Sequence, residues 1–182
     1  MMTLVRSLLL LFCLPALVQA QSFVYEREGL GLFVFDMPND WFVDTDFLDE
    51  ARAAGTADSG PPKIQIVEAM PMDGSKLWIG FWVVPNVSTL AEGLEYTRSL
   101  DQTLLKEVVA TTPEARRLGG MPAKTFSGTA VRDSESVEFA VALFEPKPEL
   151  IAVALYIGRP QTWFRHAEQL EQIRDSLQPL AD

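Results

Sequence analysis

Two stretches, SVEFAVALF at residues 136–144 and LIAVALYI at residues 150–157, decide the fold. Both carry apolar side chains on both faces of an extended chain, since successive side chains point to opposite sides. In the first stretch, a face of large side chains opposes a face made of Ala140, Ala142 and Phe144. Such strands are typical of the centre of a sheet that is covered above and below. The alanines also predict that a helix packs closely on their face.

Further strands are predicted where β-branched and aromatic residues lie between turn signals. Turns are expected at Pro38-Asn39-Asp40 and at Gly119-Gly120-Met121-Pro122. Residues 44–62 are rich in Asp, Ala, Gly and Ser, and predict a surface loop with one helical turn at residues 47–53. The expected strands are residues 31–37, 63–69, 77–84, 107–112, 115–118 and 123–131.

Two helices are predicted. Thr89 and Glu92 have the spacing of a capping box, and apolar residues at helical spacing follow, so the first helix is expected at residues 90–105. The second is expected at residues 161–177, after Pro160. Its apolar stripe comprises Trp163, Ala167, Leu170, Ile173 and Leu177. Because hairpins link most of the strands, the expected class is α+β, an antiparallel sheet with helices packed on it.

The first twenty residues have the three parts of a secretory signal. Arg6 provides a positive start, residues 8–18 (LLLLFCLPALV) form an apolar run, and Ala20 is a small residue at the expected cut. A membrane anchor would need about 20 apolar residues, and this run is shorter and contains a proline. Lipid attachment at Cys13 is disfavoured by the bulky Phe12 before it. We therefore expect a signal peptide that is cleaved near Ala20.

The rest of the chain, residues 21–182, is expected to be a single domain that is periplasmic or secreted. The sequence has a formal net charge of −10. This acidic balance argues against nucleic acid as a partner and against an anionic membrane surface. No second apolar run is long enough to span a bilayer, so no stable membrane insertion is expected after signal removal. Cys13 is the only cysteine, so the mature chain has no disulfide and no thiolate chemistry.

Three short motifs resemble those of the PsbP/Mog-like superfamily: FDMPNDW at residues 35–41, GGMPAK at residues 119–124, and the closing helix that ends at Ser176-Leu177. The resemblance covers most of residues 23–178. It implies an α/β/α sandwich, in which an antiparallel sheet lies between helices. The superfamily includes a luminal subunit of photosystem II, a Ran-binding protein, exported DcrB-like proteins and chaperones of secretion effectors. The resemblance implies binding rather than catalysis, and the superfamily has no shared catalytic residue to carry over.

No catalytic or metal-binding constellation stands out. His166 is the only histidine, and no serine lies in a nucleophile-elbow motif, so we interpret His166 as a helix-surface residue. The acidic segment 36–50 is expected to be a solvated rim. A weak divalent-cation site is the alternative there, although only Asp44-Thr45-Asp46 has calcium-loop spacing. Without cysteine in the mature chain, zinc is not expected, and neither is a cofactor.

The aromatic residues are the leading candidates for binding. Trp78 and Trp82 share one face of the strand at residues 77–84. They either pack in the core beneath a helix, or line a groove for an apolar helix or small ligand together with Trp41 or Phe42. We therefore expect an exported, non-enzymatic binding or assembly factor that contacts another envelope protein. The alternative is a small-molecule or lipid-binding domain in which the aromatic strand forms a pocket wall.

Overall fold

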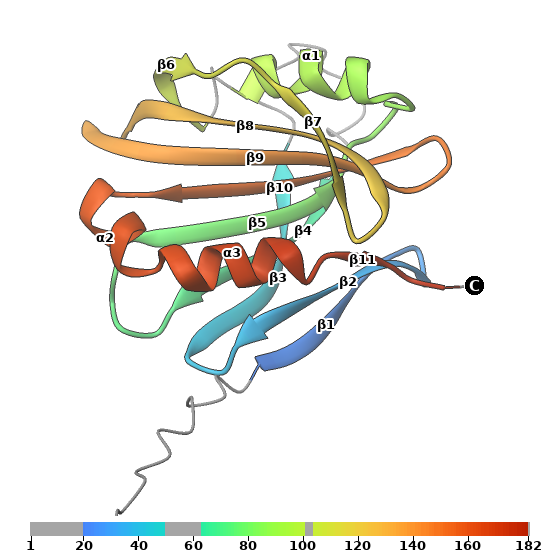
Figure 1. The fold of residues 1–182 in the computed structure, drawn as a ribbon, viewed down its shortest axis with the longest axis horizontal. Helices are drawn as coiled ribbons and strands as arrows, with labels where there is room; N and C mark the ends of the chain where they lie inside the picture. Colours follow the sequence, from blue (N-terminus) through green and yellow to red (C-terminus); the bar gives the residue numbers. More distant parts are fainter. Residues whose placement is uncertain (1–19, 50–62, 101–103, 182) are drawn as a thin grey trace, which may run out of the picture.

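The computed structural model describes residues 20–49, 63–100 and 104–181 (Figure 1). Its helices are α1 (Leu90–Leu100), α2 (Pro160–Arg165) and α3 (Ala167–Asp175). Its strands are β1 (Ala20–Arg27), β2 (Leu30–Pro38), β3 (Trp41–Asp49), β4 (Lys63–Pro71), β5 (Leu77–Val83), β6 (Lys106–Ala110), β7 (Glu114–Leu118), β8 (Met121–Arg132), β9 (Glu135–Lys147), β10 (Leu150–Gly158) and β11 (Gln178–Pro179).

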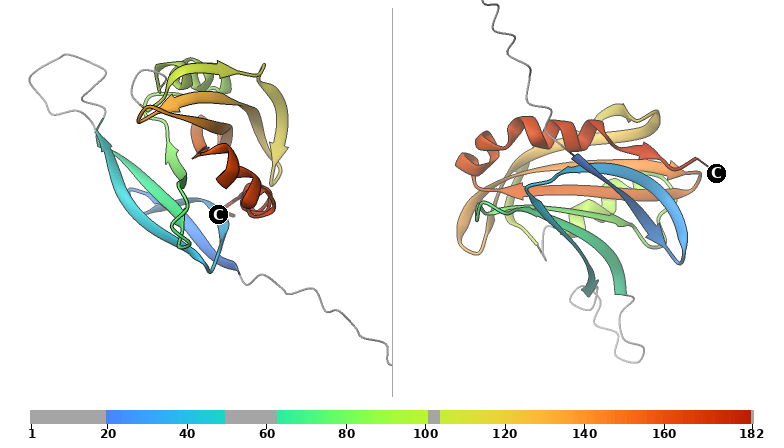
Figure 2. Two further views of the ribbon diagram at one scale, coloured as in Figure 1. Left: turned by 90° about the vertical axis from the view of Figure 1, so that its left-hand side faces the viewer. Right: turned by 90° about the horizontal axis from the view of Figure 1, so that it is seen from below.

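These strands form two antiparallel sheets. In the larger sheet the order is β3-β4-β5-β10-β9-β8-β6, and β7 also pairs with β8. In the smaller sheet β2 lies between β1 and β11. Figures 1 and 2 show the smaller sheet on the side of the larger sheet where α3 lies.

β9 and β10 lie side by side at the centre of the larger sheet. Ala142 is opposite Ala154, and Val141 is opposite Leu155. The two alanines belong to one buried cluster, while Val141 and Leu155 belong to a second cluster on the other face. The prediction of two central strands covered on both faces is therefore confirmed. We name the first face the alanine face and the second the α1 face.

Helix α1 packs on the middle of the α1 face. Leu90 and Leu94 lie against the buried cluster of that face. A Cβ atom at Gly93 would lie 3.1 Å from Ile151 and 3.3 Å from Leu143, so glycine lets the helix approach β9 and β10 closely. Helix α1 is thus positioned over these two strands.

The predicted capping box starts this helix. The backbone N–H of Glu92 donates to Thr89 Oγ1 at 3.2 Å, and the backbone N–H of Thr89 donates to Glu92 Oε2 at 3.1 Å. The reciprocal pair satisfies two amides that the first turn leaves without helical partners. The described part of the helix runs to Leu100, and residues 101–103 lie outside the described part of the chain. Leu104 and Leu105 are not helical, so the predicted end at residue 105 is wrong.

The alanine face is covered jointly by α3 and by the hairpin of β1 and β2. Phe35 of β2 stacks on Phe81 of β5 with ring centroids 4.3 Å apart. Leu170 and Ile173 of α3 join the same buried cluster. The structure is therefore mostly antiparallel sheet with few helices. A sheet enclosed between two helical layers is not clearly shown, because a β-hairpin occupies part of one face.

Near the N-terminus the described strands extend beyond the sequence prediction. Residues 20–27 form β1, which pairs with β2 and was not expected as a strand. β3 continues to Asp49 through residues expected in a loop, because each of them is paired with β4. Residues 1–19 of the proposed signal and residues 50–62 of the expected loop lie outside the described residues.

The helix predicted at residues 161–177 is two helices that meet at His166. The backbone of His166 has φ −102° and ψ 10°, which is outside helical geometry. This break changes which side chains face the core: His166 is buried, and Ala167, expected in the apolar stripe, is exposed. Leu170 and Ile173 are buried as expected.

The turn between β7 and β8 is made by Gly119 and Gly120, with φ angles of 54° and 87°. A Cβ atom at Gly119 would meet the backbone oxygen of Leu177 and lie 2.8 Å from Cα of Gln178. A Cβ atom at Gly120 would meet nothing within 4 Å. Gly119 therefore allows the C-terminal segment to pass close to this turn.

Replacing each glycine by alanine separates the cost of a positive φ angle from the cost of the close approach to residues 177–178. G120A is expected to cost about 1–2 kcal/mol, from its positive φ alone. G119A is expected to cost about 3 kcal/mol or more, because residues 177–178 must also move. Urea unfolding of both variants measures the difference. Equal losses would show that the close approach at Gly119 contributes nothing.

Two buried tyrosines differ in their hydrogen bonds. The hydroxyl of Tyr25 donates to the carbonyl of Gln65 at 2.9 Å and accepts from the N–H of Val83 at 3.3 Å. The hydroxyl of Tyr156 is buried and has no hydrogen-bond partner within the described ranges. A buried polar group without a partner costs free energy, whereas a bonded one is costly to remove.

We therefore expect opposite outcomes for two chemically identical substitutions. Y156F should leave the free energy of unfolding unchanged or raise it by about 1 kcal/mol. Y25F should lower it by about 1–3 kcal/mol, because the Val83 amide and the Gln65 carbonyl lose their partner. Thermal and urea unfolding of the two variants measures this, and a loss of stability in Y156F would contradict the assignment.

Candidate functional site

The four aromatic candidates lie in different environments. Trp82 is fully buried on the α1 face, and its Nε1 donates to the hydroxyl of Tyr96 in α1 at 3.3 Å. Trp41 is buried in the cluster of the alanine face. Phe42 is exposed, and Trp78 is half-buried. The structure therefore does not gather the four into one groove.

An exposed apolar patch lies on β3 and at the end of β4. Phe42 is paired directly with Met70, and the N–H of Met72 donates to the carbonyl of Asp40 at 2.8 Å, which extends the pairing by one residue. Phe42, Met70 and Met72 are 51%, 37% and 62% exposed. Alternation along the strands puts these side chains on the α1 face. We name these three residues the apolar patch.

Two acidic residues are paired in register beside the apolar patch. Asp44 and Glu68 are directly paired across β3 and β4, two residues along from Phe42 and Met70, and so lie on the same face. Like charges directly opposite each other on a sheet repel. No ion pair to Asp44 or Glu68 is formed by the residues that the structure describes. We name Asp44 and Glu68 the carboxylate pair.

Trp78 forms the border between the apolar patch and the rest of the face. Its indole lies across Gly80, where a Cβ atom would meet the edge of the ring and lie 2.8 Å from Ile66. Gly80 is paired with Glu68, so the indole lies beside the carboxylate pair. The guanidinium of Arg132 lies over the indole, 5.6 Å from its centroid. Of the four predicted residues, Phe42 and Trp78 are thus the two that lie on this face and reach solvent.

A separate polar junction surrounds His166, which is only 6% exposed. Its Nε2 lies 3.2 Å from Ser75 Oγ and 3.3 Å from Asp73 Oδ2. Its Nδ1 lies 2.7 Å from Gln169 Oε1. The interpretation of His166 as a helix-surface residue is therefore wrong, because the break between α2 and α3 turns the ring toward the β4–β5 connection. The sequence carried no sign of that break.

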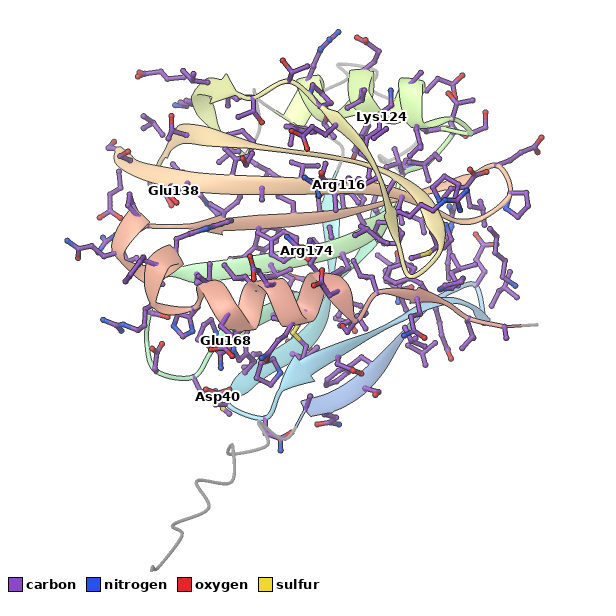
Figure 3. The ribbon with its side chains drawn as sticks, in the orientation of Figure 1. Asp40, Arg116, Lys124, Glu138, Glu168 and Arg174 are labelled. Atoms are coloured by element: carbon purple, nitrogen blue, oxygen red, sulfur yellow. The ribbon has the colours of Figure 1, made fainter. Side chains whose placement is uncertain are left out.

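Trp41 determines where the proton on His166 lies. The indole Nε1 can only donate, and it lies 3.3 Å from Gln169 Oε1, so this oxygen is an acceptor. His166 Nδ1 must therefore carry a proton and donate to the same oxygen. Gln169 Nε2 donates to Asp40 Oδ1 at 3.3 Å, and Figure 3 shows Asp40 below the start of α3, near Glu168. The junction thus joins α3 to the β2–β3 turn.

This junction lacks the arrangement of a serine-hydrolase triad. In a triad, the carboxylate and the serine occupy opposite nitrogens of the imidazole. Here Ser75 and Asp73 both face Nε2, and Nδ1 faces an amide oxygen. The described residues hold no group of three His, Cys, Asp or Glu side chains placed to bind a metal ion.

Asp73 makes the stability of this junction depend on pH. Hydrogen bonds from the Ser75 side chain and backbone lower the pKa of Asp73 to about 2, from an ordinary 3.8, and His166 adds to the same effect. The ionised carboxylate therefore stabilises the fold above about pH 4, and this contribution is lost as pH falls through 2.

The expected result is that D73N lowers the free energy of unfolding at pH 6, and that its difference from the native protein shrinks between pH 4 and pH 2. S75A should give part of the same loss, since it removes the hydroxyl donor and keeps the backbone one. Urea unfolding at a series of pH values measures both. A difference for D73N that does not change with pH would contradict the role given to Asp73.

No helix in the described residues is long and apolar enough to cross a membrane. Comparison with known proteins shows that no family model and no curated protein matches the sequence.

Solved structures do match. Cyanobacterial PsbP (CyanoP) from Synechocystis sp. PCC 6803 aligns with a TM-score of 0.59 and 13% identity, over 91% of this chain and 95% of that chain. PA94 from Pseudomonas aeruginosa, a protein of unknown function described as a putative regulator, aligns with a TM-score of 0.49 and 12% identity, over 88% of this chain and 99% of that chain. LpqN of Mycobacterium tuberculosis, involved in cell envelope biogenesis, aligns with a TM-score of 0.47 and 12% identity, over 88% of this chain and 90% of that chain. At such low identity the likeness to CyanoP concerns the fold alone, and it shows that the chain has the PsbP/Mog-like fold that its motifs predicted.

Proposed function

We propose that the protein is exported and binds another protein of the envelope through the apolar patch, without catalysing a reaction. The observation that carries this proposal is the exposure of Phe42, Met70 and Met72 together, next to the carboxylate pair. Contiguous exposed apolar side chains rimmed by polar residues are typical of protein-binding surfaces. Methionine adapts its shape to different partners, and aromatic residues contribute much of the affinity at such surfaces.

Export rests on the signal pattern of residues 1–20, and the position of β1 is compatible with it. β1 begins at Ala20, and a cut after this residue would leave the pairing of Gln21 with Met37 and all following pairs intact. The mature domain, residues 21–182, would then keep every pair of the smaller sheet except that of Ala20 with Pro38. In this proposal, the larger sheet with α1 and α3 on its two faces is the α/β/α scaffold that presents the apolar patch.

The alternative, a small-molecule or lipid pocket behind the aromatic strand, is less well supported. Trp82 is fully buried and bonded to Tyr96, so its ring fills the space beneath α1. Only Trp78, at the border of the apolar patch, reaches solvent from the aromatic strand. These placements favour contact with a partner's surface over enclosure of a ligand.

Site-specific photo-crosslinking in living cells tests the proposed function. A photoreactive phenylalanine analogue at position 42 is expected to give a discrete adduct with one envelope protein. The same analogue at position 164 is the matched control, because Phe164 is 86% exposed and lies on α2, outside the apolar patch. No adduct from position 42, or identical adducts from both positions, would contradict binding through the patch.

A further inference from the structure

We propose that the apolar patch and the carboxylate pair together bind a cationic amphipathic helix of the partner. Its apolar stripe would lie on Phe42, Met70 and Met72, and its Lys or Arg side chains would lie over Asp44 and Glu68. The inference rests on the proposed function, and specifies the chemistry that the partner must present.

The first argument is that α1 leaves this part of the face uncovered. Gly93 places α1 over Leu143 of β9 and Ile151 of β10. β4 and β3 lie two and three strands away from β10, which is about 10 Å and 14 Å at the usual strand spacing. A helix with its side chains has a radius of about 5–6 Å. Ile64 and Ile66 of β4 still belong to the buried cluster on which α1 packs, whereas Met70 and Met72, at the other end of the strand, are exposed. A second helix fits beside it on the same face.

The second argument is that the site favours a helix over an added strand. β3 is the outermost strand of the larger sheet, so a partner strand could in principle pair with its outer edge. The N–H of Thr45, however, already donates to Asp44 Oδ1 at 2.7 Å. This self-contained bond occupies a backbone donor in the middle of β3, which a new strand would need. The exposed apolar side chains lie on the face of the sheet, where a helix would pack.

The third argument is charge. Asp44 and Glu68 put two acidic residues in register across β3 and β4, with no cation from the described residues in an ion pair with either. A Lys or Arg side chain over this position would be attracted by both acidic residues. A second copy of the chain would bring the same carboxylates, and an anionic lipid surface would bring more negative charge. A cationic partner is therefore the occupant that fits.

Binding of designed peptides to the purified protein tests the inference. The probe is a fluorescent 18-residue peptide of leucine and lysine with leucine at helical spacing, a length at which an isolated helix can form. The matched peptide has glutamate in place of lysine. Fluorescence anisotropy is measured at several salt concentrations. Three variants are compared with the native protein: F42S in the apolar patch, D44N/E68Q in the carboxylate pair, and F164S as an exposed control outside both.

The expected result is that the cationic peptide binds and the acidic one does not. F42S should weaken binding about tenfold, and F164S should leave it unchanged. D44N/E68Q should weaken binding severalfold and reduce its dependence on salt. Equal affinity of all variants for the cationic peptide would overturn the inference, since binding would then reflect only the overall negative charge. Binding of the acidic peptide with similar affinity would overturn it as well.

Two further measurements identify other occupants. A dimer in sedimentation that F42S dissociates would assign the apolar patch to a second copy, and flotation with anionic vesicles that F42S abolishes would assign it to lipid. Either result overturns the inference. A specific crosslink from position 42, combined with failure of the cationic peptide, would leave the proposed function standing and refute only the helical, cationic partner. Failure of both would refute the two together.

Discussion

The pairing of β9 with β10 is the constraint on which the rest of the structure depends. This pair of strands has one apolar face with small side chains, where Ala142 is opposite Ala154, and one with larger side chains, where Val141 is opposite Leu155. A slip of one residue would exchange these faces, because side chains alternate along a strand. Each neighbouring strand is paired in a fixed register with this central pair, so its side chains point to the same two faces. What covers each face is therefore decided at the centre of the sheet.

The two faces are covered by different means, and this difference creates the candidate site. On the alanine face, rings from β2 fill the space that small side chains leave: Phe33 meets Phe144 edge-on with centroids 5.0 Å apart, and α3 closes the rest. On the α1 face, one helix covers β9 and β10 and does not extend to β3. In the described part of the chain, no helix lies over the apolar patch. Its exposure thus follows from the width of the sheet relative to that of one helix.

Short-range patterns in the sequence predicted those features of the fold that depend on short-range interactions. The strands at residues 136–144 and 150–157, the capping box at Thr89 and Glu92, and the turn at Gly119 and Gly120 each depend on residues close together in the chain, and all are present. At the break between α2 and α3, His166 contacts Ser75, which is distant in the chain, and helical spacing could not predict this contact. Whether Trp78 and Trp82 are buried depends on where α1 lies across the sheet, so sequence alone could identify the aromatic strand but not its exposed end.

The smaller sheet joins the first and the last strands of the described chain. β2 pairs with β1 on one side and with β11 on the other, and the N–H of Leu180 donates to the carbonyl of Leu32 at 3.1 Å. The aromatic rings of β2 also need β5 and β9 as their cover. The hairpin of β1 and β2 therefore lacks its third strand until β11 is made, and such long-range closure is slow. The smaller sheet can therefore be completed only once β11 is available, because β11 forms one of its two edges.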